Sequence, residues 1–312
     1  MILQQFPDIN WLKQQISQGF AHRRGPGNLQ LETDGFPSVI IHTKANNVCR
    51  PDITGPISLF INLKGNSICT IDGRRMNVTE DNYCISNRQQ QYTLQIENGQ
   101  PAETFNIHIG EHFSEKIMQG LTLSSTALLN DGNQVSTPPL AFYNKLYRKE
   151  EHFTCIINRL KLLQGKDSFD KMLFEETLAE LMMYLLQQRK NILVDIAKMP
   201  PVKTPVKEEL YKRITLATDY IQANYSKNIQ LDDIAAAACL SKFHFLRLFK
   251  QVNKVSPYQY IQDMRIKKAS HYLTTTNESI ADIAALLGYE NSNSFSRIFK
   301  QRTGVYPTQY GN

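Results

Sequence analysis

The pattern of apolar and polar positions changes twice along this chain of 312 residues. Between about residues 29 and 110, short segments alternate apolar with polar residues, and Gly or Asn turn signals separate them. This is typical of β-strands joined by tight turns. Many short strands with regular turns predict a sandwich or a small barrel. The clearest segments are 38–42, 57–63, 67–71, 92–96 and 104–109.

From about residue 137 to 193 the period becomes helical. Phe174, Leu178, Leu181 and Leu185 recur at steps of four, three and four residues, which places them on one face of a helix. Such a stripe is most often a core face, and a subunit interface is the alternative. Residues 195–207 then hold Pro200, Pro201 and Pro205 without a periodic pattern, which predicts an extended connection and a domain boundary.

The last third of the chain contains an internal repeat. Residues 247–260 (RLFKQVNKVSPYQY) and 297–310 (RIFKQRTGVYPTQY) agree at eight of 14 positions. A short helix with the letters DIAA precedes each copy, at 233–236 and 282–285. Two copies of one supersecondary unit are therefore expected.

Each copy has the pattern of a helix-turn-helix. In the first copy, helix 231–239 is followed by a turn at Ser241, a good N-cap, and by helix 242–252. In the second, Gly288 ends helix 280–287, and Asn291 or Ser292 caps the next helix. A helix capped by Ser256, with Pro257 at its first position, joins the copies. Its length of roughly 25 Å suits two recognition helices about one DNA turn, roughly 34 Å, apart.

Charge and cysteine usage agree with a nucleic-acid-binding third. Residues 207–312 carry 14 Lys and Arg against nine Asp and Glu, whereas the other 206 residues carry 21 against 20. An excess of positive charge confined to that third is typical of a domain that contacts DNA phosphates. The five cysteines show no zinc spacing, which indicates reduced thiols. The first residues are a poor signal peptide and no apolar run suits a bilayer, so we expect a cytoplasmic protein without a membrane partner.

These motifs resemble the DNA-binding domain of the AraC/XylS family of bacterial regulators. The resemblance covers about 209–312 and is most specific in IADIAALLGYENSNSFSRIFKQRTGVYPTQY. It implies base-reading residues in both recognition helices, and lysines near the helix ends suit phosphates. Phe243 and Leu246 depart from the more polar family pattern, so the first helix contacts thymine methyls or carries little sequence information. The base-reading candidates are Phe243, Leu246, Arg247, Ser292, Asn293, Ser296 and Arg297, and the phosphate candidates are Lys242, Lys250 and Lys300.

The family resemblance also implies a domain plan. It gives an α+β chain with a β-rich, cupin-like effector domain at 1–136, a helical dimerisation segment at 137–194, a linker at 195–208 and the DNA-binding domain at 209–312. Metal-binding cupins use a His cluster with Glu, but here only His108 and His112 are near each other. If His108 lies on a strand and His112 in the following turn, they do not converge, so we expect no metal, no cofactor and no catalytic residue.

The sequence thus predicts a transcription regulator that is not an enzyme. Its expected partners are double-stranded DNA, a small-molecule effector, a second copy of the chain and RNA polymerase. Two alternatives remain open at this point: a constitutive DNA-binding protein whose first half only oligomerises, and an enzyme, such as a DNA alkyl-transfer protein or a metal cupin, fused to a DNA-binding module.

Overall fold

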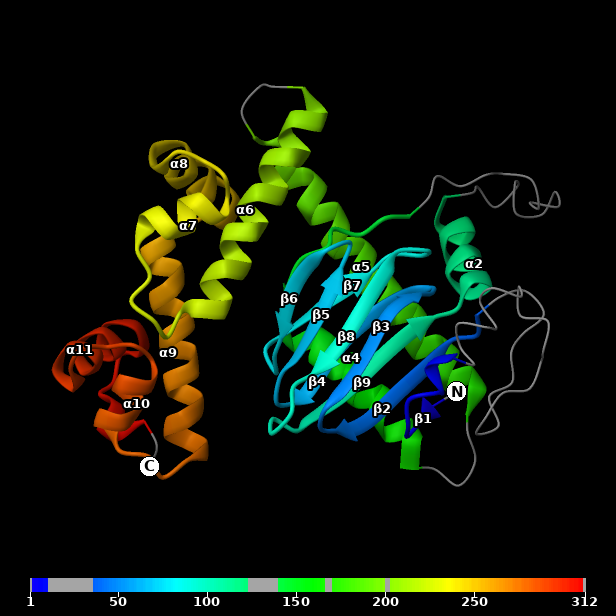
Figure 1. Cartoon of the computed structure of the whole chain (residues 1–312), viewed down its shortest axis with the longest axis horizontal. Coiled ribbons are helices and arrows are strands. Elements are labelled where there is room, and N and C mark those ends of the chain that lie inside the picture. Colours follow the sequence, from blue (N-terminus) through cyan, green and yellow to red (C-terminus); the bar gives the residue numbers. More distant parts are fainter. Residues whose placement is uncertain (1, 11–35, 123–139, 166–169, 200–202, 311–312) are drawn as a thin grey trace. The chain divides into compact units, whose positions relative to one another are not determined.

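The structure, a computed structural model, describes residues 2–10, 36–122, 140–165, 170–199 and 203–310 (Figure 1). It divides into two units, Met1–Asn191 and Ile192–Asn312, which are described separately. The boundaries predicted at 136, 194 and 208 remain predictions.

The first unit is built on two β-sheets. The six-stranded sheet has the order β1-β2-β9-β4-β7-β10, and the four-stranded sheet has the order β3-β8-β5-β6. Apart from the parallel pair β1–β2, the paired strands are antiparallel. The strands are β1 (Ile2–Leu3), β2 (Val39–Ala45), β3 (Val48–Thr54), β4 (Ile57–Lys64), β5 (Ser67–Ile71), β6 (Arg74–Val78), β7 (Asn82–Ser86), β8 (Gln91–Ile96), β9 (Ala102–Ile109) and β10 (Tyr147–Arg148).

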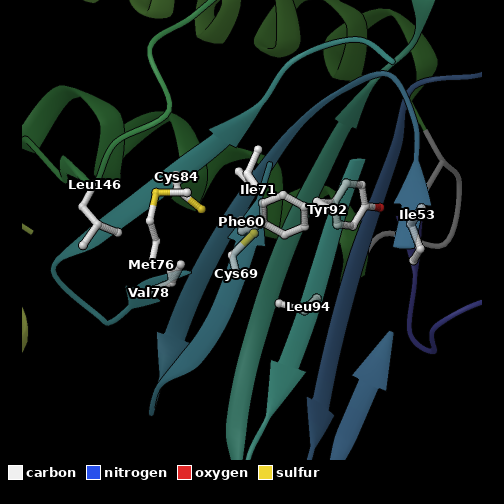
Figure 2. Packing of buried hydrophobic residues seen from close by; sticks show 10 residues of the cluster. All are labelled: Ile53, Phe60, Cys69, Ile71, Met76, Val78, Cys84, Tyr92, Leu94 and Leu146. Carbon is white, nitrogen blue, oxygen red and sulfur yellow. The ribbon is translucent and has the colours of Figure 1, made fainter. Parts of the chain in front are cut away.

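The five strands predicted from alternation are confirmed as β2, β4, β5, β8 and β9. In the described residues the two sheets exchange no paired strands, so the unit is a sandwich and not a closed barrel. Buried residues from both sheets fill the space between them, with Phe60 and Cys84 from the larger sheet meeting Cys69 and Leu94 from the smaller one (Figure 2). Inward side chains of both sheets therefore form one core.

Helices cover the outer face of the six-stranded sheet. They are α4 (Glu151–Leu162), followed by the 3-10 turn η2 (Leu163–Gly165), and α5 (Lys171–Ala197). The ring of Tyr83 on β7 stacks on Phe153 of α4 with centroids 4.1 Å apart. The predicted stripe Phe174, Leu178, Leu181 and Leu185 is fully buried within the chain. It is therefore a core face, and the subunit-interface alternative for these four residues is wrong.

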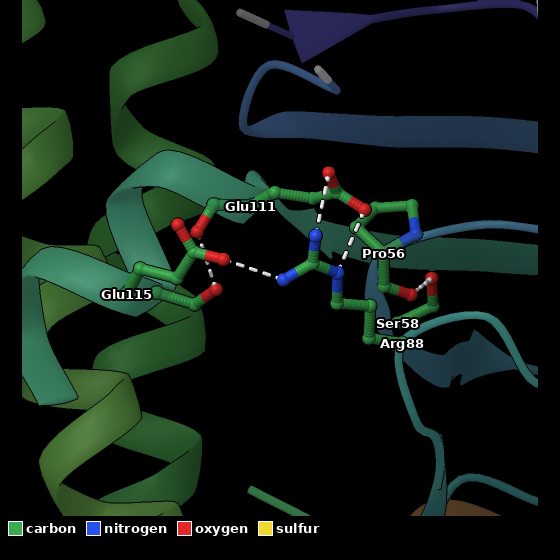
Figure 3. Close-up of polar contacts among 6 residues, drawn as sticks. Pro56, Ser58, Arg88, Glu111 and Glu115 are labelled. Atoms are coloured by element: carbon green, nitrogen blue, oxygen red, sulfur yellow. Dashed lines mark hydrogen bonds and ion pairs between the residues drawn. The ribbon is translucent and has the colours of Figure 1, made fainter. Parts of the chain in front are cut away.

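One helix of the first unit, α2 (Glu111–Thr122), directly follows the region predicted to be β. Arg88, after β7, forms ion pairs with Glu111 and Glu115 of this helix, and its Nε lies 3.0 Å from Glu111 Oε1 (Figure 3). His112 was expected in a turn but lies in the first turn of α2, because the helix starts directly after β9. It is exposed there, whereas His108 lies on β9.

The second unit contains the end of α5 and six further α-helices in its described part. These are α6 (Thr204–Asn224), α7 (Leu231–Ala237), α8 (Lys242–Asn253), α9 (Pro257–Thr275), α10 (Ile280–Leu286) and α11 (Ser292–Thr303), with the 3-10 turn η3 (Pro307–Gln309). The extended linker predicted for 195–207 is largely wrong: α5 continues to Ala197, and Pro205 lies in the first turn of α6, where proline is tolerated. Residues 200–202 lie outside the described residues. Of the helices that are described, none is both long and apolar enough to cross a bilayer.

The repeat found in the sequence is also a repeat in space. Phe245 and Phe249 of α8 have ring centroids 5.3 Å apart, and Phe295 and Phe299 of α11 have centroids 5.6 Å apart. In each copy the second Phe meets a Tyr edge-on: Phe249 meets Tyr260 at 5.7 Å, and Phe299 meets Tyr310 at 5.2 Å. All of these residues stand 50 positions apart. Both copies are therefore built on the same aromatic core.

Both helix-turn-helix turns use the same C-terminal hydrogen bonds. Leu240 N donates to Ala235 O and Cys239 N to Ala236 O, and Tyr289 N and Gly288 N donate to Ala284 O and Ala285 O. This is the Schellman arrangement, which requires a left-handed residue. Cys239 supplies it with φ +50° and Gly288 with φ +77°.

Glycine is needed at 288 because the backbone there meets another segment. A Cβ on Gly288 would lie 2.2 Å from Ser226 O and 2.9 Å from a guanidinium nitrogen of Arg265. Arg265, on α9, is buried and donates to three carbonyls: Nε to Tyr225 O at 2.7 Å, and the two Nη atoms to Lys227 O at 2.9 Å and Gly288 O at 3.0 Å. It thereby ties the end of α6 to the end of α10. We call Arg265 and these three carbonyls the arginine clamp.

A pair of glycine substitutions tests the close approach at the arginine clamp. Gly288→Ala is expected to lower the free energy of unfolding by about 3 kcal/mol or more, because left-handed strain of about 1–2 kcal/mol adds to a backbone clash. Gly304→Ala is the control: Gly304 has φ +86°, but a Cβ there meets nothing within 4 Å, so about 1–2 kcal/mol is expected. Urea unfolding followed by circular dichroism measures both. Equal losses would show that the contact with Ser226 contributes nothing.

Candidate nucleic-acid interface

The first recognition helix, α8, exposes one face because the other is fixed in the core. Phe245, Leu248 and Phe249 are completely buried. The helical period therefore directs Phe243, Arg247 and Lys250 outward, and all three are exposed. Phe243 has 86% of its surface exposed, which is exceptional for a large apolar side chain. Leu246 is half-buried beside them.

Lys242 stands at the start of α8 and has an acidic neighbour. Its Nζ lies 2.8 Å from Asp232 Oδ1 of α7, and both side chains are largely exposed. An exposed pair of this kind contributes at most about 1 kcal/mol. The ion pair therefore leaves Lys242 able to exchange Asp232 for another anion, and its phosphate role remains a prediction.

The second recognition helix, α11, presents a polar face. Asn291 caps it by accepting a hydrogen bond from Ser294 N at 2.8 Å, which resolves the two caps considered from sequence. Phe295 and Phe299 are buried, Asn293 and Arg297 are exposed, and Ser292 and Ser296 are half-buried. An open, shallow depression brings together Asn293, Ser296, Arg297 and Lys300 with Gln301, Gly304 and Tyr306. Ser292 is not part of it.

Lys300 is held at the edge of this depression by an aromatic ring. Its Nζ lies 4.0 Å from the ring centroid of Tyr306, a cation–π contact. Tyr306 follows Gly304, the left-handed residue that ends α11. A cation beside a helix end is suited to meet a phosphate.

Other chemistry is sparse in the described part of the chain. No group of three or more His, Cys, Asp or Glu side chains that could hold a metal ion is found among those residues. His108 and His112 point to separate places, one in a strand and one on an exposed helical turn. His42, on β2, instead pairs with Glu103 at 2.9 Å, and that hydrogen bond lowers the pKa of Glu103.

The arginine clamp was missed in the sequence, although a signal for it exists. Arg265 lies four residues after Ile261 and directly before Ile266, both on the buried face of α9. A charged residue in a buried stripe indicates a partner. The buried Tyr289 was missed as well: its hydroxyl donates to Gln262 Oε1 at 2.7 Å, which fixes the turn after α10 to α9.

Three comparisons place these helices among known proteins. A family model described as a helix-turn-helix domain matches residues 234–312. The bifunctional transcriptional activator and DNA repair enzyme AdaA of Bacillus subtilis is 34% identical over 97 residues, 31% of this chain and 46% of AdaA. The transcriptional activator AarP of Providencia stuartii is 33% identical over 91 residues, 29% of this chain and 67% of AarP.

One solved structure is similar over the same part of the chain. A Chromobacterium violaceum transcriptional regulator, described with the AraC-type DNA-binding domain, is 28% identical over 31% of this chain and 88% of that chain, with a TM-score of 0.30. The chain spans less than half the length of AdaA, but it covers two thirds of AarP at more than 30% identity. With its two matching helix-turn-helix units, the chain belongs to the AraC family of transcription regulators.

Proposed function

We propose that this protein is a sequence-specific, DNA-binding transcription regulator in which α8 and α11 enter successive major grooves. The observation that carries this is the pair of repeated helices with outward side chains, joined by a rigid helix. At 19 residues, α9 is about 28 Å long. This length suits recognition helices about 34 Å apart along the duplex.

The two helices have different side chains for reading DNA. Arg297 and Asn293 of α11 are exposed side chains that can form paired hydrogen bonds to guanine and adenine. Ser292 and Ser296 add single hydrogen bonds. In α8, Phe243 and Leu246 offer apolar contact to thymine methyls, and Arg247 supplies the polar contact. Lys242, Lys250 and Lys300 neutralise phosphates at the edges of these surfaces.

The first unit has a sensing role in this proposal. A small-molecule effector binds there, two copies of the chain associate, and the regulator acts in the cytoplasm on transcription by RNA polymerase. The chain has no catalytic activity. The described cysteines support this last point: Cys69 and Cys84 are buried in the sandwich core, and Cys49, Cys155 and Cys239 lie exposed on separate elements, whereas alkyl transfer needs a clustered, activated thiolate.

Selection from a random duplex library tests the proposal directly. The full chain is expected to enrich a motif of two short segments centred about 10 base pairs apart, because the recognition helices lie on one face of the duplex. The segment read by α11 is expected to be the more restrictive. Sequencing of the bound fraction measures both features. Enrichment of no motif, or of a single continuous segment, would contradict the proposal.

Arg297→Ala tests base reading by α11. It is expected to weaken binding to the selected site by about 1–3 kcal/mol while changing binding to random duplex little, because a base contact carries sequence information. Arg302→Ala is the control on the same helix, since Arg302 faces Asp263 of α9 at 3.0 Å and not the open face. Fluorescence anisotropy with both duplexes gives the ratio. An equal loss on both would identify Arg297 as a phosphate contact.

Lys300→Ala tests phosphate contact. Affinity is expected to fall alike for all sequences, and the slope of log K against log salt is expected to become shallower by about 1, because one fewer counterion is released. Lys116→Ala, which removes an exposed lysine from α2 of the first unit, is the matched control. Titrations at four salt concentrations measure the slope. A slope equal to that of the unsubstituted protein would remove this role from Lys300.

A further inference from the structure

A cavity lies between the two sheets of the first unit, beside the core shown in Figure 2. It is partly open to solvent, and its interior and mouth together enclose about 670 Å³ of empty space. Its walls are mostly apolar and come from both sheets and from the N-terminal segment. They include Phe6, Val39, Ile41, Ile53, Phe60 and Leu94.

One cation is placed in this apolar cavity by the local shape of β3. Arg50 and Ile53 both line the cavity, although their spacing of three would normally direct them to opposite faces of a strand. The register between β3 and β8 shifts between these two residues, and Asp52 in the bulge has φ +54°. Asp52 N donates to Thr93 Oγ1 at 3.1 Å, which fixes the bulge. The bulge therefore keeps both side chains turned inward.

The guanidinium of Arg50 forms no ion pair and no hydrogen bond with the described part of the chain. Its Cζ lies 5.0 Å from the ring centroid of Phe6. Burial lowers the pKa of Arg50, while Tyr92 and Asp8 act in the opposite direction. The described residues that line the cavity include no Asp or Glu. The guanidinium has five N–H donors, and no acceptor among the described residues bonds them. It is therefore suited to bind an anion from outside the chain.

His108, at the polar end of the cavity, adds no second positive charge. Ser58 Oγ donates to Pro56 O at 2.9 Å (Figure 3) and lies 2.8 Å from His108 Nδ1, so the hydrogen on Nδ1 points to Ser58. Burial, assisted by Arg50, lowers the pKa of His108 to about 4. His108 is therefore neutral at pH 7, and Arg50 is the one formal charge among the described lining residues.

We infer that this cavity binds a small apolar monocarboxylate, with its carboxylate on Arg50 and its hydrocarbon part between the two sheets. The inference rests on the proposed sensing role of the first unit and names the chemical class of its effector. Carbohydrates fit poorly, because their many hydroxyls need polar partners and the lining offers few. A divalent cation fits poorly as well, because Arg50 repels it and no carboxylate is present among the described lining residues.

Calorimetric titration of the full chain with sodium octanoate, 1-octanol and octylammonium at pH 7 tests the charge preference. Butanoate and decanoate added as further probes bracket the cavity length. Octanoate is expected to bind at least about tenfold more tightly than the alcohol, because the Arg50 hydrogen bonds are charge-assisted, and the ammonium is expected not to bind. Equal affinity for octanoate and octanol, or no binding by any of the three carboxylates, would overturn the inference.

Arg50→Met locates the anion. The variant is expected to lose about tenfold or more in octanoate affinity and to keep its octanol affinity, because methionine retains the apolar stem without the charge. Arg75→Met is the matched control: Arg75 lies on β6 of the same sheet but is exposed and pairs with Glu97 at 3.3 Å. It is expected to bind octanoate unchanged.

Arg50→Lys keeps the positive charge and is expected to retain part of the preference for octanoate over octanol. It replaces Arg50→Met as the test if the methionine variant does not fold. Equal octanoate affinity in Arg50→Met and in the unsubstituted protein would overturn the inference. DNA selection with the same preparation separates this result from the proposed function: a selected motif without octanoate binding contradicts only the ligand class.

Discussion

One buried guanidinium joins the segment before the first helix-turn-helix to the turn of the second. Arg265 of α9 donates to Tyr225 O and Lys227 O after α6 and to Gly288 O after α10. Bonds from a cation are stronger than neutral ones, and these three also satisfy carbonyls at helix ends that would otherwise lack donors. The close approach requires glycine at 288, since any Cβ would overlap Ser226 O. The arginine clamp therefore fixes the second helix-turn-helix against the first.

On this shared scaffold the two copies have diverged where they face outward. The buried positions are nearly equivalent, with Phe245 and Phe249 matching Phe295 and Phe299 in both identity and ring geometry. The exposed positions are not, because Phe243 stands where the second copy has Asn293. Core packing constrains the buried positions, since adding or removing even one methylene group there changes stability. The outward set is free of that constraint, so differences there are available for recognition.

Sequence patterns predicted the elements whose periodicity is regular and missed the parts set by long-range contacts. The repeat, the caps at Ser256 and Asn291 and five strands follow from local rules. Strand β3 was missed because Pro51 and a bulge interrupt its alternation. Pro200, Pro201 and Pro205 suggested an extended linker, but Pro205 lies in the first turn of α6. The roles of Arg265 and Arg50 were not predicted, because both depend on segments distant in the sequence. Arg265 bonds Tyr225, 40 positions away, and Arg50 lines a cavity with residues of several strands.

The two arginines are similarly placed but differ in their hydrogen-bond partners. Burial lowers the pKa of both, and both have an aromatic ring beside the guanidinium, Tyr289 at 5.2 Å for Arg265 and Phe6 at 5.0 Å for Arg50. Arg265 also has three carbonyl acceptors, so its desolvation is offset within the chain. Arg50 has no acceptor among the described residues and faces a cavity. Desolvating a charge that lacks hydrogen-bond acceptors is unfavourable. An anionic ligand on Arg50 would supply those acceptors, so occupancy of the cavity and stability of the sandwich are thermodynamically linked.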